Sequence, residues 1–181
     1  QTEMPYRNII GFGGHSAVLH YQHYQYQAQD MSKAQSFLID AGAQCHGYAS
    51  DITRCHSRDS ELYQNLIDTM TAAQLLVCAQ VKPGTQFTDL HMRMHRLVLD
   101  MLVQFNLVNG SWDELESSHI SSAFFPHGLG HLLGLQVHDI GGWQQDEAGA
   151  MLSPPAEHGF LRCTRTLEQD MVVTIEPGLY V

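Results

Sequence analysis

The sequence predicts an α+β fold, with strand-like runs near both ends and two long helices between them. Short runs rich in β-branched and aromatic residues occupy 7–12, 16–21, 36–42, 47–54 and 171–176. Apolar residues recur at steps of three and four over 59–81 and over 88–109, which is the spacing of amphipathic helices. Strands and helices that are grouped along the chain are typical of the α+β class.

Size and charge narrow the class of protein. The 181 residues suffice for one domain with a sizeable core, so we expect a single domain over residues 1–181. Nineteen acidic residues against nine Lys and Arg give a net charge of −10, which argues against a nucleic-acid or anionic-membrane partner. No apolar run approaches the roughly 20 residues that cross a bilayer.

The cysteines bear on the cellular compartment, and the two chain ends bear on the extent of the chain. The four cysteines show no CxxC spacing, so we expect free thiols in a reducing, cytoplasmic compartment. The chain begins at Gln1 rather than methionine and stops at Val181 directly after a strand-like run, so both ends look cut.

The helices have recognisable ends. The pair Asp59-Ser60 is a plausible start of the first helix, and Pro83-Gly84 ends it. Thr88 is the expected cap of the second helix, and 112–120 predicts a third, shorter one. The second helix carries His91 and His95 one turn apart, but the glutamate of an HExxH pattern is missing. An exposed position at the flank of the helix is therefore favoured over metal binding.

Two aspartates lie on neighbouring strand-like runs. If 36–42 and 47–54 form a hairpin centred on Cys45-His46, Asp40 faces Asp51 across the ladder. Such a pair of like charges, about 5 Å apart, is destabilising unless a positive charge compensates it, and a divalent cation supplies that charge. A different register, with one aspartate in solvent, remains open.

The segment 125–139 places three histidines among three glycines. His127, His131 and His138 fall within twelve residues, and the glycines allow close backbone approach to another group. Glu176 stands at the end of the last strand-like run, beside Pro177-Gly178. Histidines that satisfy polar spots in a packed core remain the alternative, but together with Asp40 and Asp51 these side chains match the ligand chemistry of a manganese, cobalt or zinc centre.

These motifs together resemble a known family. The order Asp40-Ala41-Gly42, Asp51-x-Thr53-Arg54, then the run from His127 to Asp139, then Thr174 to Tyr180 resembles the pita-bread metallopeptidases. Within that family, the segments 4–8, 18–21 and 161–165 are most similar to the bacterial Xaa-Pro dipeptidases, the prolidase and organophosphorus acid anhydrolase branch. The resemblance implies a pita-bread (creatinase/aminopeptidase-like) fold that is incomplete at the C-terminus.

The resemblance also implies a two-metal site. Asp40 would bind one ion, Asp51 would bridge both, and His131 and Glu176 would bind the second, with Mn²⁺ the first choice and Co²⁺ or Zn²⁺ the others. A hydroxide held between the ions would hydrolyse Xaa-Pro dipeptides. His20, His127 and His138 would line the substrate site, Glu176 would shuttle a proton, and the remaining implied residues are apolar wall residues: Tyr6, Leu19 and Val137. Organophosphate hydrolysis is an expected side activity, and the related enzymes suggest a homodimer.

The resemblance extends past the end of the chain. A fifth ligand, a glutamate in an Arg-x-Glu-Asp context, is expected after Val181, together with an arginine for the proline carboxylate and an N-terminal domain before Gln1. Their absence predicts a partial catalytic domain and leaves open that the chain as it stands is inactive. The alternatives are an aminopeptidase P-like enzyme acting on longer peptides, and a non-catalytic pita-bread binding module.

Overall fold

The computed structural model describes residues 3–27 and 32–181. Its elements, in chain order, are β1 (Ile9–Phe12), η1 (Gly13–Ala17), β2 (Ser36–Ala41), β3 (Gln44–Cys45), β4 (Tyr48–Ala49), β5 (Ile52–Ser57), α1 (Glu61–Cys78), α2 (Phe87–Gln104), α3 (Trp112–Ser117), α4 (Ser121–Phe124) and η2 (Ala156–His158). Two compact units divide the chain: residues 1–68 with 134–137, and residues 69–133 with 138–181. The expectation of a single domain over 1–181 stays a prediction.

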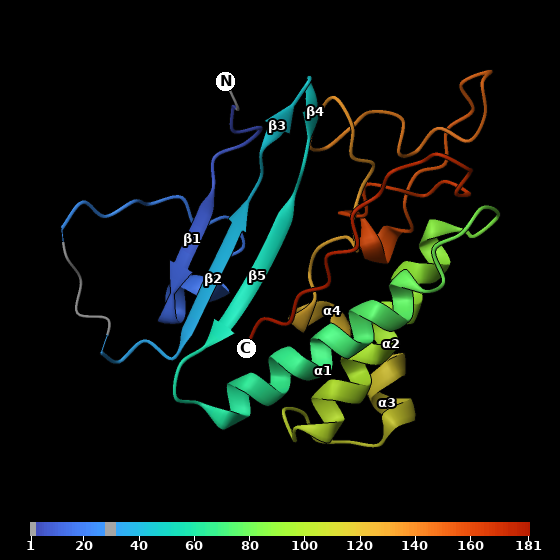
Figure 1. Cartoon of the computed structure of the whole chain (residues 1–181). Helices are drawn as coiled ribbons and strands as arrows, with labels where there is room; N and C mark the ends of the chain where they lie inside the picture. The colour runs from blue at the N-terminus through green and yellow to red at the C-terminus, as the bar shows by residue number, and fades with distance from the viewer. Residues whose placement is uncertain (1–2, 28–31) are drawn as a thin grey trace. The chain divides into compact units, whose positions relative to one another are not determined.

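An antiparallel sheet forms the first unit. Its three strands lie side by side in the order β1, β2, β5 (Figure 1), and the short strands β3 and β4 pair beyond them. Strand β2 is central, so it donates and accepts ladder hydrogen bonds on both edges. The sheet therefore fixes the position of Asp40, which stands near the end of β2.

The predicted hairpin forms, but its predicted register is wrong. The tight turn is at His46-Gly47, where both residues have positive φ, 51° and 87°, as a two-residue hairpin turn requires. Asp40 consequently pairs with Thr53, not with Asp51. Since glycine is the residue that accepts such a φ without cost, the turn settles at Gly47 and shifts the pairing by two residues.

The predicted strand over 16–21 does not form. The chain instead coils into η1 immediately after β1, where Gly13 has a positive φ of 53° and the Ser16 hydroxyl donates to the Gly13 carbonyl oxygen at 2.6 Å. A Cβ on Gly11 would lie 2.9 Å from the backbone of His15, so the chain folds back on itself too tightly for a second strand. His20 then lies in an exposed turn.

Helix α2 and the part of α1 that follows residue 68 organise the core of the second unit. The helices α1 and α2 have the bounds that the apolar spacing predicted within a few residues, although Gln86 and not Thr88 precedes α2. Their buried side chains pack with apolar residues of the later loops, among them Phe125, Leu129 and Leu161. Phe125 and Leu129 thereby anchor the start of the histidine segment. No helix among the described residues combines the length and apolar character that crossing a membrane requires.

The last strand-like run, 171–176, is extended but does not become a regular strand. It runs beside the histidine segment with one isolated bridge, Leu132 to Val173, and backbone hydrogen bonds on either side of it. The N–H of His131 donates to the Thr174 hydroxyl at 3.0 Å instead of to a ladder carbonyl. The backbones also approach very closely at Gly130, where a Cβ would fall 2.1 Å from the Thr174 carbonyl oxygen. The hydrogen bond to the Thr174 hydroxyl and the close backbone approach at Gly130 take the place of a regular ladder.

His91 and His95 are not exposed, as the sequence suggested, but buried. They are 2% and 5% exposed and lie on the same side of α2 as Leu90, Met94 and Val98. Burial first, and then the neighbouring imidazole rings, lower the pKa of His91 to about 2 and that of His95 to about 4. Both rings are therefore neutral at physiological pH.

Replacing Gly130 with alanine is expected to destabilise the second unit. The added methyl group would overlap the Thr174 carbonyl oxygen, and forcing the two backbones apart costs about 1–3 kcal/mol or more. Urea unfolding followed by circular dichroism measures this loss. Gly159→Ala is the matched control, because the nearest atom to its Cβ would be 4.0 Å away. Equal stability of the two variants would contradict the close approach.

Acidification is expected to destabilise the protein through the buried histidines. The unfolded chain takes up these protons near pH 6.5, whereas folded His95 takes up its proton only near pH 4. The stabilisation is complete above pH 6.5 and is lost as the pH falls towards 4, by about 2 kcal/mol for His95 between pH 7 and 5. Urea unfolding in EDTA at both pH values measures it. The loss should be smaller in His95→Gln, and an equal loss would refute the assignment.

Candidate metal centre

A tyrosine hydroxyl joins the two predicted aspartate ligands in the first unit. Tyr6 Oη lies 2.5 Å from Oδ1 of Asp40 and 2.9 Å from Oδ1 of Asp51. Asp40 stands on β2, and Asp51 directly precedes β5, two residues from the Thr53 that Asp40 faces. Side chains in such diagonal positions share one face of a sheet. The two carboxylates therefore come together even though their strands pair in the unexpected register.

Gly42 makes this arrangement possible. A Cβ at this position would lie 2.1 Å from the Ser50 carbonyl oxygen and 2.7 Å from the Tyr6 ring. Only glycine leaves room for the chain entering β5 and for the tyrosine that links the aspartates. The Asp-Ala-Gly motif thus has a physical reason: the aspartate is a candidate ligand, and the glycine two residues later admits its partners.

Tyr6 carries one proton for two carboxylates. Burial raises the pKa of its hydroxyl far above the usual value, and the hydrogen bonds and negative charges of Asp40 and Asp51 raise it further. The phenol therefore stays neutral, and its single hydrogen can be donated to one carboxylate at a time. Two carboxylates close together concentrate negative charge and hydrogen-bond acceptors, which fits a cation. The sequence suggested only an apolar wall for Tyr6, because a lone tyrosine far from the motif gives no signal of this bond.

In the second unit, His131 and Glu176 face each other. Nε2 of His131 lies 3.0 Å from Oε1 of Glu176, and the histidine is 2% exposed. The hydroxyl of Thr174 accepts from the backbone N–H of His131 and donates to the same Glu176 oxygen, both at 3.0 Å. One threonine thus positions both predicted ligands. Gln74 of α1 adds a hydrogen bond to the carbonyl of Ile175, which holds the same segment.

The protonation pattern of His131 suits a metal ligand. Its Nδ1 lies 2.9 Å from the Leu132 carbonyl oxygen, which can only accept, so Nδ1 bears the hydrogen. In the neutral ring, Nε2 then presents a lone pair towards a carboxylate oxygen. Two acceptors 3.0 Å apart require a proton or a cation between them. A backbone carbonyl that fixes the tautomer in this way is the usual outer support of a metal-bound histidine.

The other predicted site histidines lie in three different settings. His138 packs edge-on against His131, with ring centroids 4.5 Å apart. His127 has Nδ1 2.9 Å from the carbonyl oxygen of Gly128 and Nε2 3.3 Å from the hydroxyl of Tyr180. His20 is in the exposed turn after η1 and takes no part in the hydrogen bonds between Tyr6 and the two aspartates. Tyr180 closes the motif that begins at Thr174, but no role was predicted for it.

The donor atoms fit divalent metal ions. Each unit supplies two of the predicted ligands, Asp40 and Asp51 in the first and His131 and Glu176 in the second. The first pair offers carboxylate oxygens, and the second offers one carboxylate and one imidazole nitrogen, donor types that manganese, cobalt and zinc accept. In both units the donors face another acceptor, so a positive charge would stabilise each pair.

Known proteins resemble the chain over its whole length. It is 46% identical over 183 residues to the Xaa-Pro dipeptidase of Shewanella frigidimarina and 48% identical over 181 residues to that of Shewanella baltica. In each case the match covers 100% of this chain and 41% of the relative, so the chain spans about two fifths of these relatives.

Solved structures of aminopeptidase P also resemble the chain over nearly its whole length. Zinc-substituted Escherichia coli aminopeptidase P in complex with product matches with a TM-score of 0.80 and 32% identity, covering 98% of this chain and 37% of that one. A variant of the same enzyme in complex with substrate also has a TM-score of 0.80, with 31% identity. The likeness confirms the pita-bread fold that the motifs implied. Residues 1–181 also match the family model throughout, so the chain belongs to metallopeptidase family M24.

Proposed function

We propose that the chain is the metal-binding part of a hydrolase that cleaves Xaa-Pro dipeptides. The observation that carries this proposal is the pair of acceptor-rich sites, Asp40 with Asp51 and His131 with Glu176, in a chain 46–48% identical to several Xaa-Pro dipeptidases. These side chains are of the types that hold two divalent ions, and all four predicted positions keep a ligand-competent residue. A non-catalytic module would have no need to keep them.

Asp40, Asp51, His131 and Glu176 would hold the ions, and Mn²⁺ is the proposed metal because oxygen donors outnumber nitrogen. Bound ions of this kind lower the pKa of water and polarise a carbonyl oxygen. Within the chain, Thr174 holds the Glu176 carboxylate, and the Leu132 carbonyl holds the ring of His131. Glu176 is the group proposed to carry a proton to the leaving proline nitrogen.

The remaining histidines are proposed to bind the substrate. The Nδ1 hydrogen of His127 is engaged by the carbonyl of Gly128, so its Nε2 accepts from the Tyr180 hydroxyl. His127 therefore acts with Tyr180 as a unit in holding the peptide, while His138 beside His131 is the candidate to stabilise negative charge on the reacting carbonyl. His20 completes the proposed set from the first unit.

Aminopeptidase P activity on longer peptides is the second candidate. It is supported by the structural likeness to the Escherichia coli enzyme, but at 31–32% identity against 46–48% for the dipeptidases. Organophosphate hydrolysis is a proposed side activity of the same ions. A cytoplasmic location is proposed from the cysteines, which are all free thiols, and a homodimer remains a proposal by analogy with the family.

Proline release in a hybrid enzyme tests the function. The matching 41% of the Shewanella frigidimarina dipeptidase is replaced by this chain, and hydrolysis of Ala-Pro is measured with added Mn²⁺. We expect activity, and a loss of about 1,000-fold or more in Asp51→Asn, because the ions lose a charged ligand.

The same exchange with the Shewanella baltica segment is the matched control. If that hybrid is active while a folded hybrid with this chain releases no proline, the proposed function is wrong. Release of alanine from Ala-Pro-Ala but not from Ala-Pro would favour the aminopeptidase alternative.

Metal content tests whether the two aspartates bind the same ion. In the hybrid, Asp40→Asn and Asp51→Asn should each lower Mn²⁺ affinity, and the double variant should lose much less than the sum of the two, because residues that bind one ion are energetically coupled. Equilibrium dialysis with manganese analysis measures the three affinities. Strict additivity would mean that Asp40 and Asp51 act independently of each other.

A further inference from the structure

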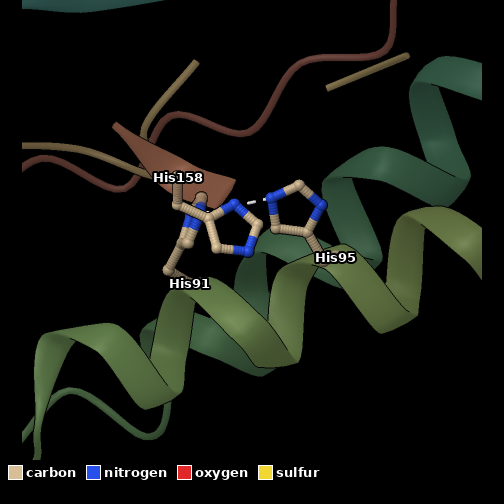
Figure 2. Close-up of side chains that lie close together, drawn as sticks. All are labelled: His91, His95 and His158. Carbon is tan, nitrogen blue, oxygen red and sulfur yellow. Dashed lines mark hydrogen bonds between the residues drawn. The ribbon is translucent and has the colours of Figure 1, made fainter. Parts of the chain in front are cut away.

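Three histidines outside the proposed centre meet in the second unit. His91 and His95 project from successive turns of α2, and His158 reaches them from η2 (Figure 2). Their ring centroids lie 4.5 Å apart for His91 and His95, 4.5 Å for His91 and His158, and 4.6 Å for His95 and His158. Two elements far apart in sequence thus bring three imidazoles together.

The nitrogen positions match those of a tetrahedral site. Nε2 of His91 and Nε2 of His95 are 3.2 Å apart, and one ring nitrogen from each of the three residues lies within 4.8 Å of the others. Ligand nitrogens about 2.0–2.1 Å from a tetrahedral zinc ion are about 3.3 Å from one another. Two of the three donors already have nearly this separation, and a small side-chain rotation of the half-buried His158 would bring in the third.

The surroundings leave the rings available for a ligand. Nδ1 of His95 lies 3.0 Å from the Ser121 hydroxyl, which leaves Nε2 for another partner. Nδ1 of His91 is buried and has no hydrogen-bond partner among the described residues. A cavity of about 20 Å³ is lined by His91, His158 and Glu157, among others. That volume is enough for one water molecule or one small ion.

The electrostatic environment favours neutral imidazoles, the form that binds metals. Burial first, and then the proximity of neighbouring imidazole rings, lower the pKa values of His91 and His95. Burial also lowers the pKa of His158, against the opposing effect of the Glu157 carboxylate. Protonating any one ring would place a positive charge against the other two, whereas a single shared cation satisfies all three lone pairs. Phe125 packs at 4.8 Å from the ring of His95 and limits access of water from that side.

We propose that His91, His95 and His158 bind one Zn²⁺ ion, with water or the Glu157 carboxylate as the fourth ligand. Three imidazoles select zinc over manganese and magnesium, which prefer oxygen. The site shares no ligand with the proposed Mn²⁺ centre and does not depend on the proposed function. Such an ion would fix the end of the long loop 141–159 to the middle of α2, so its role is structural.

Zinc titration of the full 181-residue chain tests this site. The chain carries Asp40→Asn, Asp51→Asn and Glu176→Gln, so that both pairs of the other centre lose charged ligands, and Zn²⁺ is titrated in competition with a chromophoric chelator. We expect one Zn²⁺ per chain, and His158→Gln should weaken its binding on the order of 100-fold or more. His46→Asn is the matched control, since His46 is an exposed histidine of the first unit and asparagine tolerates its positive φ of 51°.

X-ray absorption of the same substituted chain, loaded with zinc, provides a measurement that needs no change at the three histidines. The proposal expects three imidazole nitrogens in the zinc shell. A folded chain that takes up no zinc would show that the three rings form a hydrogen-bonded cluster alone. Binding that His158→Gln leaves unchanged, or a shell dominated by carboxylate oxygen, would equally overturn the site.

Discussion

Crowding of hydrogen-bond acceptors is the constraint on which the candidate centre depends. Asp40 and Asp51 share a single hydroxyl hydrogen, and the lone pair of His131 faces a carboxylate oxygen of Glu176. Such arrangements are unfavourable by themselves, because like charges and lone pairs repel in a partly dry environment. The fold maintains them with backbone contacts that leave no space for a side chain, at Gly42 in one unit and Gly130 in the other. The glycines and the ligands of the motifs therefore serve the same purpose.

The identities of the candidate ligands could be predicted from the sequence, but their geometry could not. The histidine and carboxylate motifs are dense and occur in a fixed order, so they pointed to the family without any coordinates. The hairpin register depended on where a tight turn forms, and the positive φ of His46 is not visible in its residue type. The role of Tyr6 depended on a contact between residues 34 and 45 positions apart, which no local pattern encodes.

Helix α2 shows a different limit. Its apolar spacing placed the helix correctly, yet His91 and His95 were expected at its flank. They follow directly after Leu90 and Met94, so they lie at the edge of the buried stripe of α2. The later segment that carries His158 covers this edge, and the spacing within α2 does not reveal that contact. Likewise, residues 171–176 have the composition of a strand, but the Thr174 side chain takes a hydrogen bond that a regular ladder would have made. In both cases a tertiary contact overrode a correct local tendency.

The hydroxyl of Tyr6 has a consequence for the affinity of the carboxylate site. It holds Asp40 and Asp51 in one orientation before any ion arrives, so much of the conformational entropy of ordering them is lost during folding rather than during association. An incoming ion must break or rearrange a strong hydrogen bond but need not organise two mobile side chains. This preorganisation favours ions that accept the existing spacing of the oxygens and disfavours those that would demand a different one, so selectivity is built into the resting protein.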